Sequence, residues 1–126
     1  RAFSIYIILG LFILPVFHQG GSLGYLLTPN FGYLLGLYPL IKIIDNLNNR
    51  NKINVGNFLK NGFIAICAMH LTGIFYNFIQ IIFFSHFNIF LYNLGKYSLG
   101  KIGYHFLMLF PLLLLIKPIK HFKKSK

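Results

Sequence analysis

Residues 20–36 read GGSLGYLLTPNFGYLLG and carry no charged side chain. The glycines at positions 20, 21 and 24 allow the backbone to turn sharply or to approach a ligand closely. Apolar segments typical of membrane helices flank the stretch on both sides. The pattern predicts a glycine-rich loop that joins two membrane-embedded helices and leads directly into the second.

The composition of the whole chain also predicts a membrane protein. Hydrophobic residues make up 56% of the 126 residues, and the mean hydropathy is +0.68. Charged residues make up only 10%, against about 25% in soluble domains. At this length we expect one domain, so residues 1–126 should form a single transmembrane domain.

The positive charge is clustered along the chain. Five of the twelve Lys and Arg lie within residues 117–126, and three lie within 50–60. This is the positive-inside pattern of membrane proteins, and it differs from the basic stripe of a nucleic-acid-binding protein. We therefore expect no nucleic-acid partner, a cytoplasmic location for residues 48–60 and the C-terminal tail, and an external location for residues 18–30.

Four apolar segments predict membrane helices, and each span needs about 20 residues. We place them at Ala2–Phe17, at Phe31–Leu47 with a kink at Pro39, at Asn57–Gln80 with Asn57 as N-cap, and at Leu99–Ile116 with Pro111 inside.

Two apolar segments fall short of a full span. Ile81–Asn93 is interrupted by polar residues, so we predict an interfacial or re-entrant piece. Ala2–Phe17 is short and follows no initiator Met, which leads us to expect that N-terminal helices are missing. A signal peptide is the alternative for this segment, but no cleavage site of small residues follows it.

Two stripes of polar residues recur at helical spacing inside the predicted helices. They consist of His70, Gly73, Asn77 and Gln80 in the third segment, and of Lys101, Tyr104, His105 and Met108 in the fourth. Polar side chains in lipid face the bundle interior or a wet cavity. The stripes therefore predict a pocket near the outer surface. The alternatives are hydrogen bonds that only hold helices together, and a Lys101 that extends to the interface.

Catalytic and metal sites are not expected. Asp45 is the single acidic residue, so a pair of carboxylates for acid–base catalysis is excluded. No Ser or Cys stands in a nucleophile motif, no His, Cys or Glu set has metal-ligand spacing, and no nucleotide-binding loop is present. We expect no enzyme activity and no cofactor, so a partner would have to hydrolyse any ATP.

The run TPNFGYLLG, residues 28–36, resembles the Gly-Pro-Thr-Gly-Gly-Tyr-x-x-Gly signature of the BioY family, the biotin-binding S components of energy-coupling factor (ECF) vitamin transporters. The matching residues are Pro29, Gly32, Tyr33 and Gly36, whereas Thr28, Asn30 and Phe31 replace the Gly, Thr and Gly of the family. The preceding LPVF, residues 14–17, also looks like the segment that leads into the family's loop.

The last helix departs from the family pattern. The family shows Pro-Gly-Asp-x-x-Lys there, whose Asp and Lys face the ligand, and this chain shows LGKIGY at residues 99–104. Gly100 matches, Lys101 replaces the acid, and Tyr104 replaces the lysine. We infer that Lys101 reaches the carboxylate of the ligand instead.

The resemblance implies an all-α, multi-pass protein of the cell membrane, with about four transmembrane helices present of a six-helix bundle. It implies capture of biotin at the outer face, with membrane lipids, a transmembrane coupling subunit and ATPase subunits as partners. The expected ligand contacts are Gly20, Gly21, Tyr25, Asn30, Gly32, Tyr33, Asn77, Lys101 and Tyr104, of which Tyr33 is carried over from the family signature.

Other functions stay open. A membrane interaction or assembly subunit without transport activity would use the polar stripes only for packing. An S component for another vitamin would keep the fold and change the ligand. An intramembrane enzyme is disfavoured because the chain lacks an acid–base set.

Overall fold

The computed structural model describes residues 2–17, 20–50, 54–84 and 87–115. The basic tail from Lys117, Arg1 and part of the 48–60 segment lie outside the described residues, and so does Ile116. Within the described ranges every regular element is helical, apart from an isolated bridge between Phe17 and Gly20. The prediction of an all-α fold is confirmed for this part of the chain.

The elements follow one another along the chain as helices of unequal length. They are α1 (Ala2–Phe12), the 3₁₀ turn η1 (Leu23–Leu27), α2 (Pro29–Leu35), α3 (Leu37–Arg50), α4 (Val55–Phe84), α5 (Phe87–Asn93), the π-helical turn η2 (Leu94–Leu99), α6 (Gly100–Leu107), α7 (Leu109–Leu112) and the 3₁₀ turn η3 (Leu113–Leu115).

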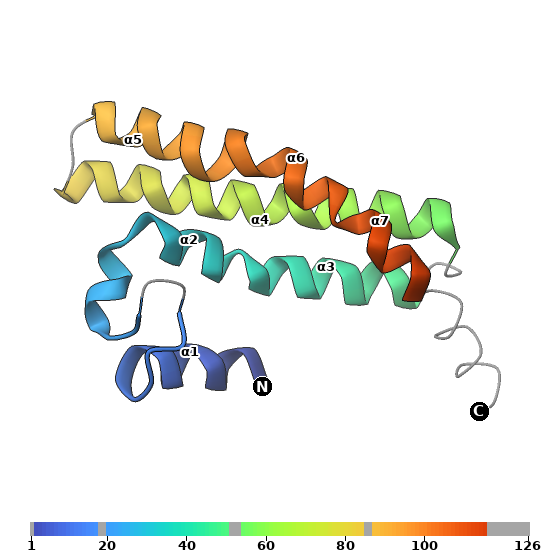
Figure 1. Cartoon of the computed structure of the whole chain (residues 1–126), viewed down its shortest axis with the longest axis horizontal. Coiled ribbons are helices and arrows are strands. Elements are labelled where there is room, and N and C mark those ends of the chain that lie inside the picture. The colour runs from blue at the N-terminus through green and yellow to red at the C-terminus, as the bar shows by residue number, and fades with distance from the viewer. Residues whose placement is uncertain (1, 18–19, 51–53, 85–86, 116–126) are drawn as a thin grey trace.

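Three long helical rods lie side by side in Figure 1, formed by α2–α3, by α4 and by α5–α7. The central α4 packs against α2 and α3 on one side and against α6 on the other. At 1.5 Å per residue the rods are about 33, 45 and 39 Å long, and a bilayer core is about 30 Å thick. Among the described helices, α4 is the one that is by itself long and apolar enough to cross a membrane.

The interruptions of the outer two rods follow from proline. Pro39 cannot donate to the carbonyl of Leu35, and its ring crowds that carbonyl, so the helix is interrupted at Gly36, one turn before the proline. Pro111 has the same effect on the last rod, which is interrupted at Met108. The helix break thus lies three residues before Pro39, where the sequence predicted a kink.

The expected N-cap of the third segment was wrong. The side-chain oxygen of Asn54 accepts a hydrogen bond of 2.7 Å from the backbone N–H of Asn57, and α4 begins at Val55. Asn57 is therefore the third helical residue, whose N–H an N-cap side chain satisfies. The cap lies three residues earlier than the sequence pattern indicated.

The re-entrant piece expected at Ile81–Asn93 was also wrong. Residues 81–84 complete α4, and α5 continues through η2 into α6 as one rod antiparallel to α4 (Figure 1). The two antiparallel rods contact each other through aromatic side chains, since the rings of Phe78 in α4 and Phe90 in α5 meet edge to face at 6.2 Å between centroids. The apolar residues thus extend two full-length helices.

The first segment forms a shorter helix than Ala2–Phe17. It ends at Phe12, because Pro15 disfavours helical geometry at the residue before it. The chain then folds back so that the ring of Phe17 lies against Gly10, where a Cβ atom would come within 2.1 Å of that ring. Phe17, Tyr25 and Phe31 form the buried aromatic cluster that joins α1, η1 and α2.

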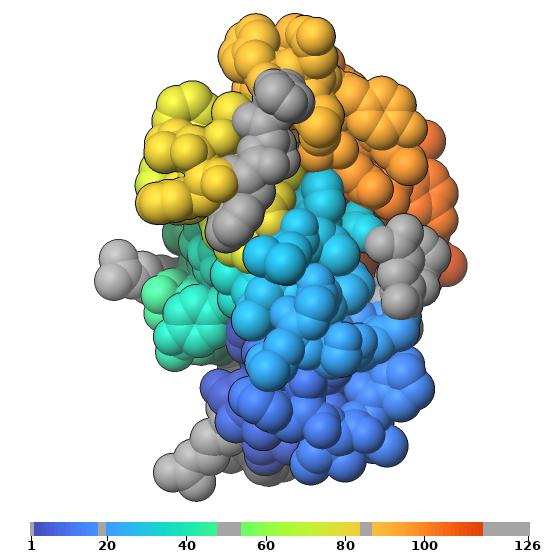
Figure 2. Space-filling view, turned by 90° about the vertical axis from the view of Figure 1, so that its left-hand side faces the viewer, coloured from blue at the N-terminus to red at the C-terminus, as the bar shows by residue number. Residues whose placement is uncertain are grey.

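The end-on view in Figure 2 shows η1 and α2 lying between α1 and the ends of α4 and α5. Large apolar side chains remain exposed along the rods, including Leu71 and Phe75 of α4 and Leu107 of α6, each at least 65% exposed. Many large exposed apolar side chains are typical of a surface covered by lipid or by a partner.

Candidate functional site

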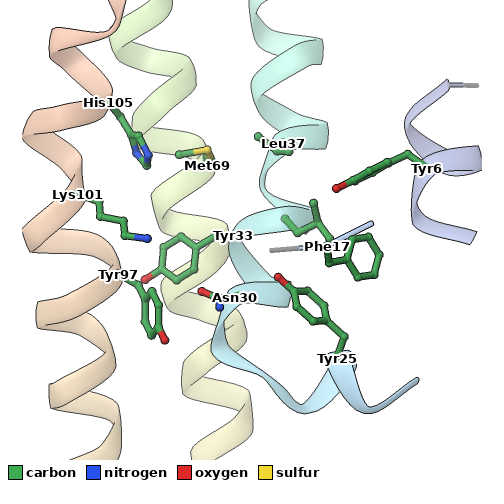
Figure 3. Close-up of a pocket in the computed structure, with 11 residues that line it drawn as sticks. Tyr6, Phe17, Tyr25, Asn30, Tyr33, Leu37, Met69, Tyr97, Lys101 and His105 are labelled. Atoms are coloured by element: carbon green, nitrogen blue, oxygen red, sulfur yellow. The ribbon is translucent and has the colours of Figure 1, made fainter. Parts of the chain in front are cut away.

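A cavity of about 310 Å³ lies where the loop, α1 and the three rods converge (Figure 3). This volume falls within the range of about 300 to 1,000 Å³ that small-molecule sites occupy. Its lining consists of Tyr6, Phe17, Tyr25, Asn30, Tyr33, Leu34, Leu37, Met69, Tyr97, Lys101 and His105. Segments from both ends of the described chain therefore build one site.

One wall of the cavity is aromatic. The ring of Phe17 packs on Tyr25 with centroids 4.6 Å apart and on Tyr6 edge to face at 5.5 Å. Phe17 and Tyr25 are buried. Burial raises the pKa of the Tyr25 phenol, and the neighbouring Tyr6 acts in the same direction. The wall therefore offers an apolar surface with neutral hydroxyl groups at its edge, as Figure 3 shows for Tyr6 and Tyr25.

The opposite wall carries a positive charge. The ammonium group of Lys101 lies 5.5 Å from the ring centroid of Tyr97, and Figure 3 shows the Lys101 side chain extending toward Tyr33. Asp45, the single acidic residue of the chain, is not among the lining residues. An ammonium group in an apolar membrane protein requires an anionic or polar partner. The site is thus suited to a ligand that carries a carboxylate.

The glycine-rich loop is fixed to the far end of α4. The Tyr76 hydroxyl donates a hydrogen bond to the carbonyl of Leu26, and the Gln80 amide donates to the same carbonyl at 3.4 Å. The Thr28 hydroxyl donates to the Tyr25 carbonyl at 2.8 Å. These bonds satisfy carbonyls at the end of η1 and thereby position Tyr25 over the cavity.

A chain of hydrogen bonds runs behind the cavity. The hydroxyls of Tyr33 and Ser98 share a bond of 2.7 Å, Ser98 meets Nδ1 of His70 at 3.2 Å, and Nε2 of His70 meets Nδ1 of His105 at 2.9 Å. His70 and Ser98 are buried, at 2% and 3% exposure. His70 therefore joins α4 to η2 and α6, and Tyr33 and His105, at the two ends of this series of hydrogen bonds, line the cavity.

The structure brings four of the predicted contacts together in the lining, namely Tyr25, Asn30, Tyr33 and Lys101. The other five lie outside it, namely Gly20, Gly21, Gly32, Asn77 and Tyr104. Their role as ligand contacts stays a prediction.

The positions of these five residues have structural reasons. A Cβ atom at Gly32 would lie 2.5 Å from the Tyr76 side chain, and one at Gly21 would lie 2.5 Å from the Gly10 carbonyl, so both glycines allow close packing. Gly20 adopts a φ of +104° in the loop. Asn77 is buried and donates to the Gly73 carbonyl at 3.0 Å. Tyr104 is 57% exposed on α6.

Several lining residues were missed from the sequence, and only one of them left a signal. His105 belongs to the same stripe as Lys101, at a spacing of four residues, and this spacing is the signal that could have added it to the expected ligand contacts. Phe17, Met69 and Tyr97 enter the lining through contacts between distant elements. Their positions in the sequence show no pattern that would have selected them.

Comparison with known proteins gives two matches. A curated protein described as "Probable biotin transporter BioY" from Lysinibacillus sphaericus is 46% identical over 46 residues, which cover 36% of this chain and 24% of the relative. The match thus spans about a quarter of the relative's length. No solved structure matches the chain significantly. The profile of the BioY family matches residues 1–113 of the 126. The chain therefore belongs to the BioY family.

Proposed function

We propose that this chain is the substrate-capture component of an ECF transporter and binds biotin at the outer face of the cell membrane. The observation that carries this proposal is the cavity, which combines the Lys101 ammonium group with an aromatic wall beneath the glycine-rich loop. Membership of the BioY family and the name of the Lysinibacillus relative support biotin as the ligand.

Biotin has three chemically distinct parts, and the lining offers a partner for each. The valerate carboxylate would pair with Lys101, and the apolar thiophane ring would pack on Phe17 and Leu34. The ureido group donates and accepts hydrogen bonds, which suits the Asn30 amide and the Tyr25 hydroxyl. In this proposal the lining residues only bind the ligand, which leaves the site chemically unchanged.

Uptake against a gradient needs energy that this chain does not supply. Its sequence contains no nucleotide-binding loop. In our proposal a transmembrane coupling subunit and ATPase subunits move the loaded protein, and the multi-pass bundle keeps the cavity accessible from outside.

Thermal unfolding of the protein in lipid nanodiscs tests the proposal. Saturating biotin should raise the midpoint of unfolding, because a ligand that binds only the folded state stabilises it by RT ln(1 + [L]/Kd). Tyr33→Ala should reduce this shift, whereas Tyr38→Ala removes an exposed tyrosine of α3 outside the lining and should not. A shift with another carboxylate vitamin and none with biotin would reassign the ligand. The absence of any shift would favour a subunit that serves only assembly.

A further inference from the structure

The hydrogen-bonded series of Tyr33, Ser98, His70 and His105 has a feature that packing alone does not require. Both of its ends line the cavity, while its two middle members are withdrawn from it. Ser98 belongs to the π-helical turn η2, and such turns are frequent at functional sites. Apolar residues would fill the space of the two buried members, His70 and Ser98, without the cost of burying polar side chains.

The hydrogen bonds of this series constrain which ring nitrogens of His70 and His105 carry a proton. The 2.9 Å contact between Nε2 of His70 and Nδ1 of His105 needs one N–H group and one bare nitrogen. When His70 is the donor, its Nδ1 accepts from the Ser98 hydroxyl, and Ser98 accepts from the Tyr33 hydroxyl. His105 then carries its proton on Nε2. When His105 is the donor, its Nε2 is bare.

We propose that His70 is the donor, that His105 consequently presents Nε2–H to the cavity, and that this group and the Lys101 ammonium together recognise a carboxylate. Lys101 and His105 lie one turn apart on α6 and line the same wall. A carboxylate only accepts hydrogen bonds, so a bare nitrogen beside it would repel it. His105 is thus a specificity-determining contact, and His70 is the positioning residue that fixes its tautomer.

The binding test rests on the proposed function, since its probes are biotin and biotin amide. In nanodiscs, His105→Phe should weaken biotin binding about tenfold, the effect of losing one hydrogen bond to a charged group, and should weaken amide binding less, because the uncharged amide carbonyl accepts a weaker hydrogen bond. His70→Leu should act in the same direction. His70→Gln should restore the preference for the acid, because its amide N–H can donate to Nδ1 of His105.

Thr72→Val is the matched control for the His70 variants. It removes a hydrogen bond from the same helix, made by the Thr72 hydroxyl to the Ala68 carbonyl, and leaves the hydrogen bonds of His70 and His105 in place. The ratio of its affinity for biotin to its affinity for biotin amide should equal that of the wild type. Equal loss of acid and amide binding in His70→Leu and His105→Phe would overturn the proposal, because a purely structural role does not discriminate between the two ligands.

Nitrogen-15 NMR of labelled histidine reads the tautomer directly and needs no ligand. The expected spectrum shows His105 protonated on Nε2 in the wild type and in His70→Gln, and an altered tautomer population in His70→Leu. A wild-type His105 protonated on Nδ1 would refute the proposed direction. A protein that binds neither biotin nor its amide would refute the proposed function. The ring spectra would still decide whether His70 or His105 donates the hydrogen bond between them.

Discussion

Lys101 places an ammonium group in the wall of the cavity, in a chain whose single acidic residue lies elsewhere. Its immediate neighbour is the ring of Tyr97, whose centroid also lies 5.2 Å from the Lys96 ammonium group. A cation over an aromatic ring is attracted by about 0.5 to 1 kcal/mol at an exposed site. That attraction is weaker than a charge-assisted hydrogen bond, so a carboxylate ligand would add to the interactions of Lys101.

Lys101→Met should weaken biotin binding tenfold or more. A charge-assisted hydrogen bond contributes about 1.5 to 3 kcal/mol, and about 1.4 kcal/mol corresponds to a factor of ten in Kd. Binding of biotin amide, which lacks the charge, should change much less. Isothermal titration calorimetry with both ligands measures the difference.

Lys96→Met serves as the control, because it removes the second ammonium group beside Tyr97 from outside the cavity lining. Its effect on both ligands should be small. If Lys101→Met weakens acid and amide equally, then Lys101 is an interfacial anchor and the carboxylate is held by another group.

At the scale of elements, α4 organises the site although it contributes one lining residue, Met69. Its far end fixes the loop through Tyr76 and Gln80, and its middle holds His70. Gly73 lets the Tyr33 ring lie directly on the helix, where a Cβ atom would come within 2.4 Å of it. The shape of the cavity therefore depends on close packing between α2 and α4.

Gly32→Val tests this dependence. The added side chain would meet the Tyr76 side chain at 2.5 Å and push α2 away from α4, which displaces Asn30 and Tyr33. Overpacking of this kind costs about 1 to 3 kcal/mol. Ligand binding should fall strongly, while the amount of protein inserted in the membrane should stay close to that of the wild type.

Gly103→Val is the matched control, because a Cβ atom at this exposed position of α6 meets nothing within 4 Å. Gly103→Val should leave both ligand binding and the amount of inserted protein unchanged. Normal binding per inserted molecule in Gly32→Val would show that the contact between α2 and α4 does not shape the site.

At the scale of the whole molecule, the three rods and the loop define two ends. Gln80, near the end of α4, holds the loop, whereas Val55 begins α4 at the opposite end. The two positions are 25 residues apart in one helix, or about 37 Å. That separation exceeds the thickness of a bilayer core of about 30 Å. Opposite sides of the membrane are therefore expected for the loop and for the start of α4.

Single-cysteine labelling in intact cells checks this topology. On a Cys67→Ser background, Ser22→Cys in the loop should react with a membrane-impermeant maleimide from outside. Val55→Cys, which is 54% exposed, should react only after the cells are opened. The positive-inside pattern of Lys and Arg gives the direction. Labelling of position 22 only in opened cells would invert the orientation.

The sequence alone determined the class of protein and the family. Apolar composition and helical spacing are local properties, and they predicted helices in the right regions, while the run at residues 28–36 identified BioY and selected Tyr33 and Asn30. The ends of the helices could not be predicted as well from the sequence. The start of α4 and the extent of α4 and α5 depend on a capping contact and on packing between Phe78 and Phe90, and neither alters local composition.

Only the tertiary structure decided which side chains meet. The bonds from His70 to His105 and from Tyr33 to Ser98 join residues 35 and 65 positions apart, and a helical pattern gives the face of one helix but not the partner that covers it. The fold-back after Pro15, which brings Phe17 into the cavity lining, depends on the space that Gly10 leaves open. A binding site in a bundle is built from contacts between helices, so its geometry arises only when the helices pack.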